Sequence, residues 1–294
     1  MTSIAFIGLG NMGGGMAANL AKAGHDVRAF DLSPDALDRA KTAGCLPVAS
    51  AAAAVEGAEV VVTMLPAGTH VETVYTHEVF PAAAPNTLLI DCSTIDVDTA
   101  KRVATAAHAK GLVAVDAPVS GGIAAATAGS LTFMVGGSEA GFERAQVILE
   151  AMGKAVIHAG MNGAGQAVKI CNNMLLGASM IATSEAFLLA EKLGLDPQKF
   201  FDISSVSSGQ NWSMTSYCPL PGVGPETPAD HDYQGGFAVA LMLKDLKLAM
   251  QAAQAAGAVT PMGARAADLY QAYADQGQGG VDFSGIIRML AAKQ

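Results

Sequence analysis

The sequence predicts an α/β protein in which a mostly parallel sheet covered by helices comes first and an all-helical region follows. Up to about residue 160, short runs rich in β-branched residues alternate with helical segments. The strand pattern stops after Ala155–Ile157. A helical pattern then continues from about Ala164 to Lys192, spanning roughly 40 Å, which is longer than one small domain needs. We therefore expect two domains, residues 1–162 and 163–294, joined by this long helix.

The first strand runs directly into a glycine-rich turn. Residues 4–7 are apolar, and the glycines that follow have the spacing G-x-G-x-x-G. In dinucleotide-binding domains the first glycine permits a tight turn, the second lets backbone N–H groups approach phosphate, and the third lets the helix pack on the strand. The pyrophosphate then lies at the helix N-terminus. The predicted cofactor contacts in this turn are Gly8, Leu9, Gly10, Asn11, Met12 and Gly13.

The second strand ends in an acid. A helical pattern with Met16 and Leu20 ends before Gly24, and the strand 27–31 follows, closing with Asp31. An acid there accepts hydrogen bonds from the adenosine ribose hydroxyls and repels a 2′-phosphate. Residues 32–34 contain no arginine that would bind such a phosphate. The sequence therefore indicates a Rossmann-type domain and favours NAD over NADP.

Four further strands are expected at 60–64, 88–91, 112–116 and 131–135. Ser33 before Pro34, and Asp96 before an alanine-rich stretch ending near Lys110, are typical helix N-caps. The residues after two of the strands share the carboxyl edge of the sheet and are predicted to line the nicotinamide ribose, although each is also compatible with an ordinary loop. These residues are Leu65 and Pro66 after the first strand, and Ser93 and Thr94 after the second.

Composition excludes several classes of protein. The chain of 294 residues is 51% hydrophobic and 15% charged with a net charge of −9, so disorder and a nucleic-acid surface are not expected. The four cysteines and six histidines lack ligand spacing, and we expect no metal. The first strand starts at Ser3, which leaves no room for a leader peptide, and no uncharged apolar run reaches membrane-spanning length. We expect a cytoplasmic protein whose partners are small molecules or copies of itself.

The long helix carries the strongest candidate for proton transfer. Lys169 and Asn173 lie at i and i+4 and share one face. Hydride transfer from an alcohol to NAD needs a base for the hydroxyl proton, and a partly desolvated lysine can serve. The alternative is a surface lysine beside asparagines, but the apolar neighbours Val168, Ile170 and Leu175 speak against a solvated face.

Two other segments have candidate binding residues. Ser120, Gly121 and Gly122 follow the strand 112–116, where a hydroxyl and two N–H groups form a nest suited to a carboxylate, unless the segment is a plain turn. Lys244 lies in a helix predicted for 241–256 and offers a second cation, unless it forms a solvated pair with Asp245. Between them, Tyr217–Gly236 is rich in proline and glycine and is predicted to be a long ordered loop.

Together these motifs resemble the β-hydroxyacid dehydrogenase family nearly end to end. The resemblance rests on Gly8–Gly13 with Met16–Leu20 and Ala23–His25, on Asp116–Gly122, on Gly163–Asn173 and on Lys244–Leu246. It implies a 6-phosphogluconate-dehydrogenase-like fold, a Rossmann-type domain followed by an all-helical one. Lys169 is implied as the catalytic acid/base. Ser120, Gly121, Gly122 and Asn173 are implied to hold the substrate, with Lys244 facing the cofactor and active site.

The resemblance also implies a dimer or tetramer built through the helical domain. One branch of the family is favoured by Ser207–Trp212, by the loop 217–237 and by Asp282–Ser284, and Trp212 is predicted to contact the substrate. The implied activity is NAD-dependent oxidation of a small β-hydroxy acid. Serine, 3-hydroxypropionate and tartronate semialdehyde remain alternative substrates, and a non-catalytic NAD sensor or scaffold, or an imine reductase, remain alternatives of a different class.

Overall fold

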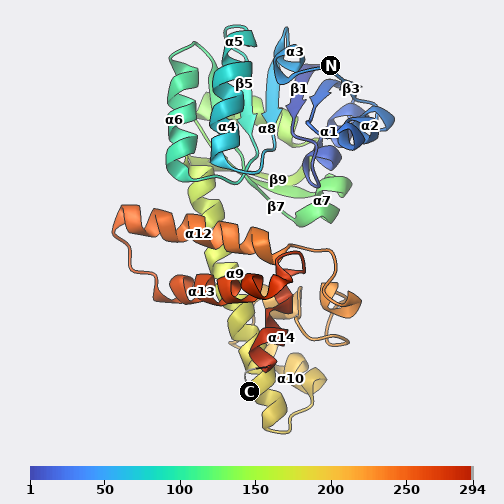
Figure 1. Cartoon of the computed structure of the whole chain (residues 1–294), viewed down its shortest axis with the longest axis vertical. Coiled ribbons are helices and arrows are strands. Elements are labelled where there is room, and N and C mark those ends of the chain that lie inside the picture. The colour runs from blue at the N-terminus through green and yellow to red at the C-terminus, as the bar shows by residue number, and fades with distance from the viewer. Residues whose placement is uncertain (293–294) are drawn as a thin grey trace. The chain divides into compact units, whose positions relative to one another are not determined.

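The computed structural model describes residues 1–292 and divides the chain by its contacts into two compact units (Figure 1). The sheet unit comprises Met1–Lys169, and the helical unit begins at Ile170. Helix α9 (Ala164–Lys192) starts in the first and continues in the second.

Within the described residues of the sheet unit, the strands form one sheet in the order β3-β2-β1-β4-β5-β6-β8-β7, with β9 beside β8. The first six strands are parallel, β8 runs antiparallel to β6 and β7, and β9 runs parallel to β8. The strands are β1 (Ser3–Ile7), β2 (Asp26–Phe30), β3 (Leu46–Pro47), β4 (Val60–Thr63), β5 (Leu88–Asp91), β6 (Val113–Asp116), β7 (Val119–Ser120), β8 (Leu131–Gly136) and β9 (Gly153–Gly160). The predicted strands are confirmed to within a few residues at their ends. The two-residue strands β3 and β7 were not predicted, because they are too short for a hydrophobic pattern.

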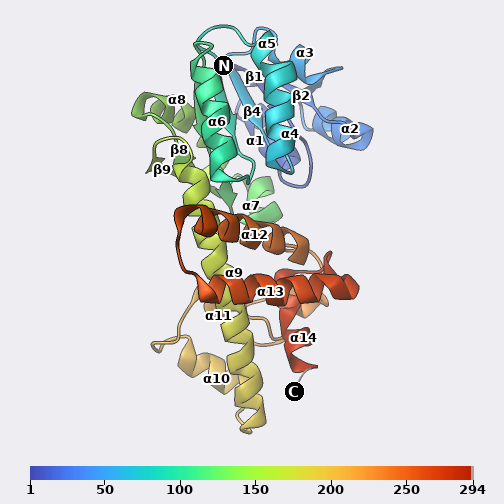
Figure 2. The ribbon, with the colours of Figure 1, turned by 60° about the vertical axis from the view of Figure 1, so that its left-hand side comes forward.

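Helices cover both faces of the sheet (Figures 1 and 2). An apolar core lies on each face. One face packs against α1 (Gly13–Lys22), α2 (Pro34–Thr42), α7 (Gly122–Ala128) and α8 (Glu139–Leu149). The other packs against α3 (Ala51–Val55), α4 (Gly68–Val74) with the π-turn Tyr75–Val79, and α6 (Val97–His108), while Phe80 and Ala82 of α5 (Phe80–Ala82) are partly buried against that core. The predicted caps are confirmed: Ser33 Oγ accepts from Ala36 N, and Asp96 Oδ1 accepts from Thr99 N at 2.8 Å.

The helical unit is built around the continuation of α9 and two neighbouring helices, α12 (Val239–Ala256) and α13 (Pro261–Tyr273), which lie side by side (Figure 2). The remaining elements are α10 (Pro197–Ser204), α11 (Trp212–Thr215), the 3₁₀ turns Pro228–His231 and Phe283–Gly285, the π-turn Ala274–Gln278 and α14 (Ile286–Ala291). As predicted, Asp196 and Pro197 open α10, and Gly194 lies just past α9.

Two features of this unit bear on sequence predictions. The segment 217–236 is ordered by internal hydrogen bonds, such as Tyr233 Oη to the Pro219 carbonyl at 2.8 Å and Gly222 N to Asp230 Oδ1 at 2.7 Å. Helix α9 is long and apolar enough to cross a membrane by length and composition alone. Half of its most apolar 18-residue stretch is buried inside the protein, and core helices often have the same length and composition.

Candidate active site

The carboxyl ends of β1, β2, β4, β5 and β6 meet at one edge of the sheet, since these strands are parallel and in register. Ile7 pairs with Thr63, Thr63 with Asp91, and Asp91 with Asp116. This edge therefore brings together the glycine turn, Asp31, Leu65 with Pro66, and Ser93 with Thr94, as the sequence predicts. Ligands of such sheets bind at this edge.

At two positions the glycine turn has no room for a side chain. Gly8 has φ +96°, and a Cβ there would lie 2.3 Å from the Met64 carbonyl oxygen. A Cβ on Gly13 would lie 1.9 Å from the Gly8 carbonyl oxygen, so α1 starts in direct contact with the turn. The backbone N–H groups that open α1 therefore lie next to β1, in the arrangement that binds a pyrophosphate.

Asp31 is held against this turn. Its Oδ2 accepts from Leu9 N at 2.6 Å, and its Oδ1 accepts from Ser33 N at 2.8 Å. Each carboxylate oxygen can accept a further hydrogen bond, so both remain able to bind a ribose hydroxyl. Asp31 therefore lies directly after β2 and in contact with the glycine turn.

A groove of about 540 Å³ lies along the glycine turn and contains a cation that sequence reasoning missed. Its lining includes Gly10, Asn11 and Gly14 of the turn and α1, together with Arg39 of α2. Arg39 lies outside residues 32–34, the end of the second strand, where a cation for a 2′-phosphate is expected. The helical period of α2, which brings Ala36, Arg39 and Ala40 to one side, was the available signal.

Ser120, Gly121 and Gly122 form the junction of β7 and α7. Ser120 pairs with Thr132 of β8, and both glycines have positive φ, +135° and +70°. A Cβ on Gly121 would lie 2.6 Å from the Ala125 Cβ. The segment is thus more than a plain turn, because a strand end, two left-handed glycines and a helix N-terminus meet within three residues.

Lys169 is only 7% exposed, so the surface-lysine alternative is wrong. It lies one turn into α9, and the first turn of α9 is bound to the sheet edge. Gly163 N and Gln166 N donate to the two oxygens of Asp116 at 2.6 and 3.0 Å. The Gln166 side chain donates to the Ser93 carbonyl at 2.7 Å and accepts from Ile95 N at 3.1 Å.

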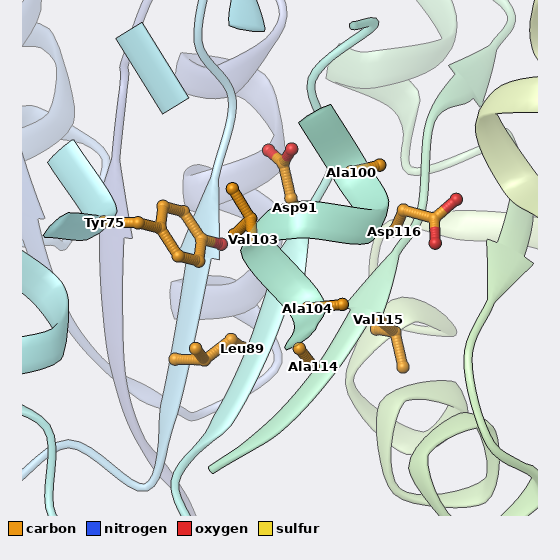
Figure 3. Close-up of a pocket in the computed structure, with 9 residues that line it drawn as sticks. All are labelled: Tyr75, Leu89, Asp91, Ala100, Val103, Ala104, Ala114, Val115 and Asp116. Atoms are coloured by element: carbon orange, nitrogen blue, oxygen red, sulfur yellow. The ribbon is translucent and has the colours of Figure 1, made fainter. Parts of the chain in front are cut away.

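A second buried carboxylate, Asp91, lies opposite Asp116 on the neighbouring strand (Figure 3). Its Oδ1 accepts from Thr63 Oγ1 at 2.8 Å and from Ser93 Oγ at 2.6 Å, and Ser93 Oγ in turn accepts from Leu65 N at 2.8 Å. A small cavity of about 20 Å³ is lined by Asp91, Asp116 and Tyr75, among others. Burial raises the pKa of Asp91 to about 6 and also raises that of Asp116. Sequence reasoning missed both carboxyls as parts of the site.

In the helical unit, Asn173 is 2% exposed and its Nδ2 donates to Asp245 Oδ2 at 2.6 Å. Asp245 is itself buried, at 3%, and its Oδ1 lies 3.8 Å from Lys244 Nζ. The alternative, in which Lys244 and Asp245 form a solvated pair, is therefore wrong, because the Asp245 side chain is buried. Sequence reasoning missed Asp245, although its spacing from Met242 and Ala249 places it on the buried face of α12.

Trp212 is half-exposed at the start of α11, and its ring stacks on Tyr217 with centroids 4.9 Å apart. Tyr217 Oη donates to the buried Asp282 at 2.9 Å. The stacking on Tyr217 thus sets the orientation of the Trp212 ring, through the loop predicted to distinguish branches of the family. Among residues 1–292, no group of three or more His, Cys, Asp or Glu side chains is arranged to hold a metal ion.

A Rossmann-type sheet with its glycine turn and strand-end acid, followed by an all-helical unit, defines an NAD-binding oxidoreductase. The model of the NAD-binding domain of 6-phosphogluconate dehydrogenase matches residues 3–160. A model described as the NAD-binding part of NADP-dependent 3-hydroxyisobutyrate dehydrogenase matches residues 163–290. The chain belongs to the 3-hydroxyisobutyrate dehydrogenase family.

Individual relatives agree over the whole chain. A 3-hydroxyisobutyrate dehydrogenase of Pseudomonas aeruginosa is 53% identical, with 100% of both chains covered. The solved structure of Mycobacterium tuberculosis 3-hydroxyisobutyrate dehydrogenase with L-serine has a TM-score of 0.95 at 50% identity and covers 99% of each chain. An NAD-dependent L-serine dehydrogenase of Pseudomonas aeruginosa is 47% identical, covering 100% of this chain and 99% of its own. An imine reductase from Pseudomonas sp., at 17% identity and a TM-score of 0.64, shares the fold.

Proposed function

We propose that the protein oxidises 3-hydroxyisobutyrate to methylmalonate semialdehyde with NAD, the step known from valine catabolism. The observation that carries the proposal is the buried Lys169, one turn before the buried Asn173 on α9. The relatives named as 3-hydroxyisobutyrate dehydrogenases, at 50 to 53% identity, support the choice of substrate.

Each predicted residue has one task in this reaction. NAD, when bound, supplies the acceptor for the hydride that leaves the carbinol carbon. Lys169 Nζ takes the hydroxyl proton as general base and returns it in the reverse reaction. Ser120 Oγ and the N–H groups of Gly121 and Gly122 bind the substrate carboxylate. Asn173 orients the substrate hydroxyl, and Asp245 holds the Asn173 amide by accepting from its Nδ2.

The remaining assignments concern binding. Trp212 contacts the substrate, while the cofactor is bound by the glycine turn, Asp31, Leu65, Pro66, Thr94 and Lys244. Among the cofactor contacts, the assignment of Leu65 has the best support. Its N–H donates to Ser93 Oγ, and the Ser93 carbonyl accepts from Gln166 at the start of α9.

The substitution Lys169→Ala tests the proposal. We expect turnover to fall at least about 10³-fold, the upper part of the range for a general base, with the dissociation constant for NAD changed less than about threefold. Lys192→Ala is the matched control, because this exposed lysine ends the same helix. Oxidation by the unchanged enzyme should rise with pH through the apparent pKa of the base. Full turnover by the Lys169→Ala protein would overturn the assignment.

We propose NAD rather than NADP as the preferred cofactor, on the ground that the Asp31 carboxylate lies at the end of β2 against the glycine turn. Asp31→Asn should then raise the ratio of kcat/KM for NADP to that for NAD. Arg39→Gln serves as a second variant, because Arg39 is the cation in the adjoining groove. A wild-type preference for NADP that Arg39→Gln abolishes would reverse the proposal.

A second candidate, L-serine, is favoured by the 47% identical L-serine dehydrogenase and by the solved relative determined with L-serine. Initial rates with both enantiomers of 3-hydroxyisobutyrate, serine, 3-hydroxypropionate and glycerate separate the two. A one-methyl difference in a pocket discriminates by only about 1–3 kcal/mol, so side activities are expected. Absence of turnover with every acid, in protein that binds NAD, would favour the non-catalytic sensor.

We also propose a cytoplasmic homodimer or homotetramer. Large apolar side chains are exposed on the helical unit, namely Leu189, Leu193, Leu195, Ile203 and Val206. Leu189, Leu193 and Leu195 lie within seven residues of the chain, and exposed apolar side chains that gather in this way are typical of an interface. Light scattering after size exclusion measures the mass directly, and a monomer at micromolar concentration would contradict the proposal.

A further inference from the structure

The residue before α9 is Gly163, which has no side chain to cap the helix, and the first turn is bound by groups distant in sequence. Asp116, at the end of β6, accepts from Gly163 N at 2.6 Å and from Gln166 N at 3.0 Å, and the Gly165 N–H also donates to it. A helix N-terminus has N–H groups that need such acceptors, and a carboxylate there is also favoured by the helix dipole.

This contact is closely packed and buried. Asp116 is 4% exposed and Gln166 is fully buried. A Cβ on Gly165 would lie 2.3 Å from the Met134 carbonyl oxygen, and one on Gly136 would lie 2.6 Å from Asp116 Oδ1. Glycine at both positions lets the helix end, β6 and β8 approach one another so closely that the start of α9 has no room to shift.

Gln166 forms a second attachment, to the next strand along the sheet. It bridges the Ser93 carbonyl at 2.7 Å and Ile95 N at 3.1 Å, in the loop after β5. Ser93 also accepts from Leu65 N through its Oγ, at 2.8 Å. The same few side chains thus hold the start of α9 and two loops at the edge of the sheet where a dinucleotide binds.

We propose that Asp116 and Gln166 are positioning residues for Lys169, which hold its amine at a set place relative to the cofactor edge of the sheet. The reason is geometric: Lys169 follows Gln166 by three residues within a continuous helix, so any shift or rotation of the first turn moves Lys169 with it. Misplacement of a reacting group by about 1 Å can cost about 10²-fold in rate. This inference rests on the proposed role of Lys169.

The test is Asp116→Asn, with kcat and KM measured for the hydroxy acid and NAD. One side of the asparagine amide is a donor, so it cannot accept from both Gly163 N and Gln166 N. We expect kcat to fall about 10- to 100-fold, while KM for NAD changes less than about threefold because the glycine turn is untouched. Gln166→Met, which keeps the length of the side chain and removes its polar atoms, should lower kcat in the same way by about 5- to 20-fold.

Asp196→Asn is the matched control, because Asp196 caps α10 by accepting from Lys199 N at 2.9 Å and has no contact with the start of α9. It should lower the thermal midpoint slightly and leave kcat unchanged. If Asp116→Asn does not fold, Gln166→Met carries the test alone. A kcat within twofold of wild type in folded Asp116→Asn or, failing that, in Gln166→Met would overturn the inference, provided that Lys169→Ala abolishes turnover. Turnover retained by Lys169→Ala would overturn the proposed function and the inference with it.

Discussion

The sheet unit and the helical unit each bury an aspartate at a junction, and they do so differently. Asp116 is 4% exposed and Asp282 is fully buried, burial raises the pKa of both, and both accept hydrogen bonds from uncharged donors. Asp116 ends a strand, and its donors are the N–H groups of one helix turn. Asp282 lies in a loop and accepts from Tyr217 Oη, Phe237 N, and both the N–H and the hydroxyl of Ser284.

The difference separates two uses of a buried carboxylate. At the sheet edge, the register of the strands sets the position of the Asp116 carboxylate, and this carboxylate binds the start of a single helix. In the helical unit, the Asp282 carboxylate binds Tyr217 and Phe237, which precede it by 65 and 45 residues in the chain. It thereby organises a loop that has little regular structure. The fold of the loop should therefore depend on Asp282 more than the fold of the sheet depends on either of its buried carboxyls.

The largest loss of stability is expected from Asp282→Ala. It leaves several buried donors without an acceptor, and we expect the free energy of unfolding to fall by about 3–5 kcal/mol. Hydrogen exchange should show that amides of 217–238 lose protection while those of β1 and β4 keep it. Asp275→Ala, at an exposed helical aspartate, is the control. Equal loss of protection in both units would contradict the claim that Asp282 organises only the loop.

The next effect is the pH dependence of stability that originates from Asp91. Its pKa in the folded protein, about 6, lies above the ordinary value of 3.8, so between about pH 4 and 6 the folded state binds more protons than the unfolded state. Stability from this group is therefore present at low pH and is lost as the pH rises through 6, by about 3 kcal/mol for two pKa units.

Asp91→Asn removes this contribution. Urea denaturation at pH 4.5 and 7 should show that the variant loses less stability than wild type as the pH rises, because the asparagine does not ionise. Comparing the two proteins cancels the titration of all other groups. Identical pH profiles would mean that Asp91 ionises normally, and that the sheet edge is more hydrated than its burial indicates.

The smallest effects are expected from removing one hydroxyl at each centre. Tyr217→Phe deletes the donor to Asp282, and Ser93→Ala deletes a donor to Asp91 together with the acceptor of Leu65 N. Each should cost about 1–2 kcal/mol in the free energy of unfolding. Only Ser93→Ala should also weaken NAD binding, because only it releases a loop at the cofactor edge; titration of NAD by fluorescence measures this. Weaker NAD binding in Tyr217→Phe would contradict the separation of the two centres.

The fold was largely predictable from local pattern. Strand and helix periodicity, the caps Ser33 and Asp96, and the glycine turn all act between residues a few positions apart, and the structure has each of them. Lys169 and Asn173 were found because one helical turn separates them. The short strand β7 and the orientation of Trp212 were not, because both depend on partners in other elements.

Local residue patterns were enough to predict the order of strands and helices, the glycine turn with Asp31, and the helix that carries Lys169. Tertiary structure alone decided that Asp116 binds Gly163 and Gln166, 47 and 50 residues away, and that Asp245 holds Asn173 across 72 residues. The physical reason is range. Backbone propensity and side-chain periodicity are set by neighbours in the chain, whereas a buried polar group must be paired with whatever donor the packed fold brings within 3 Å.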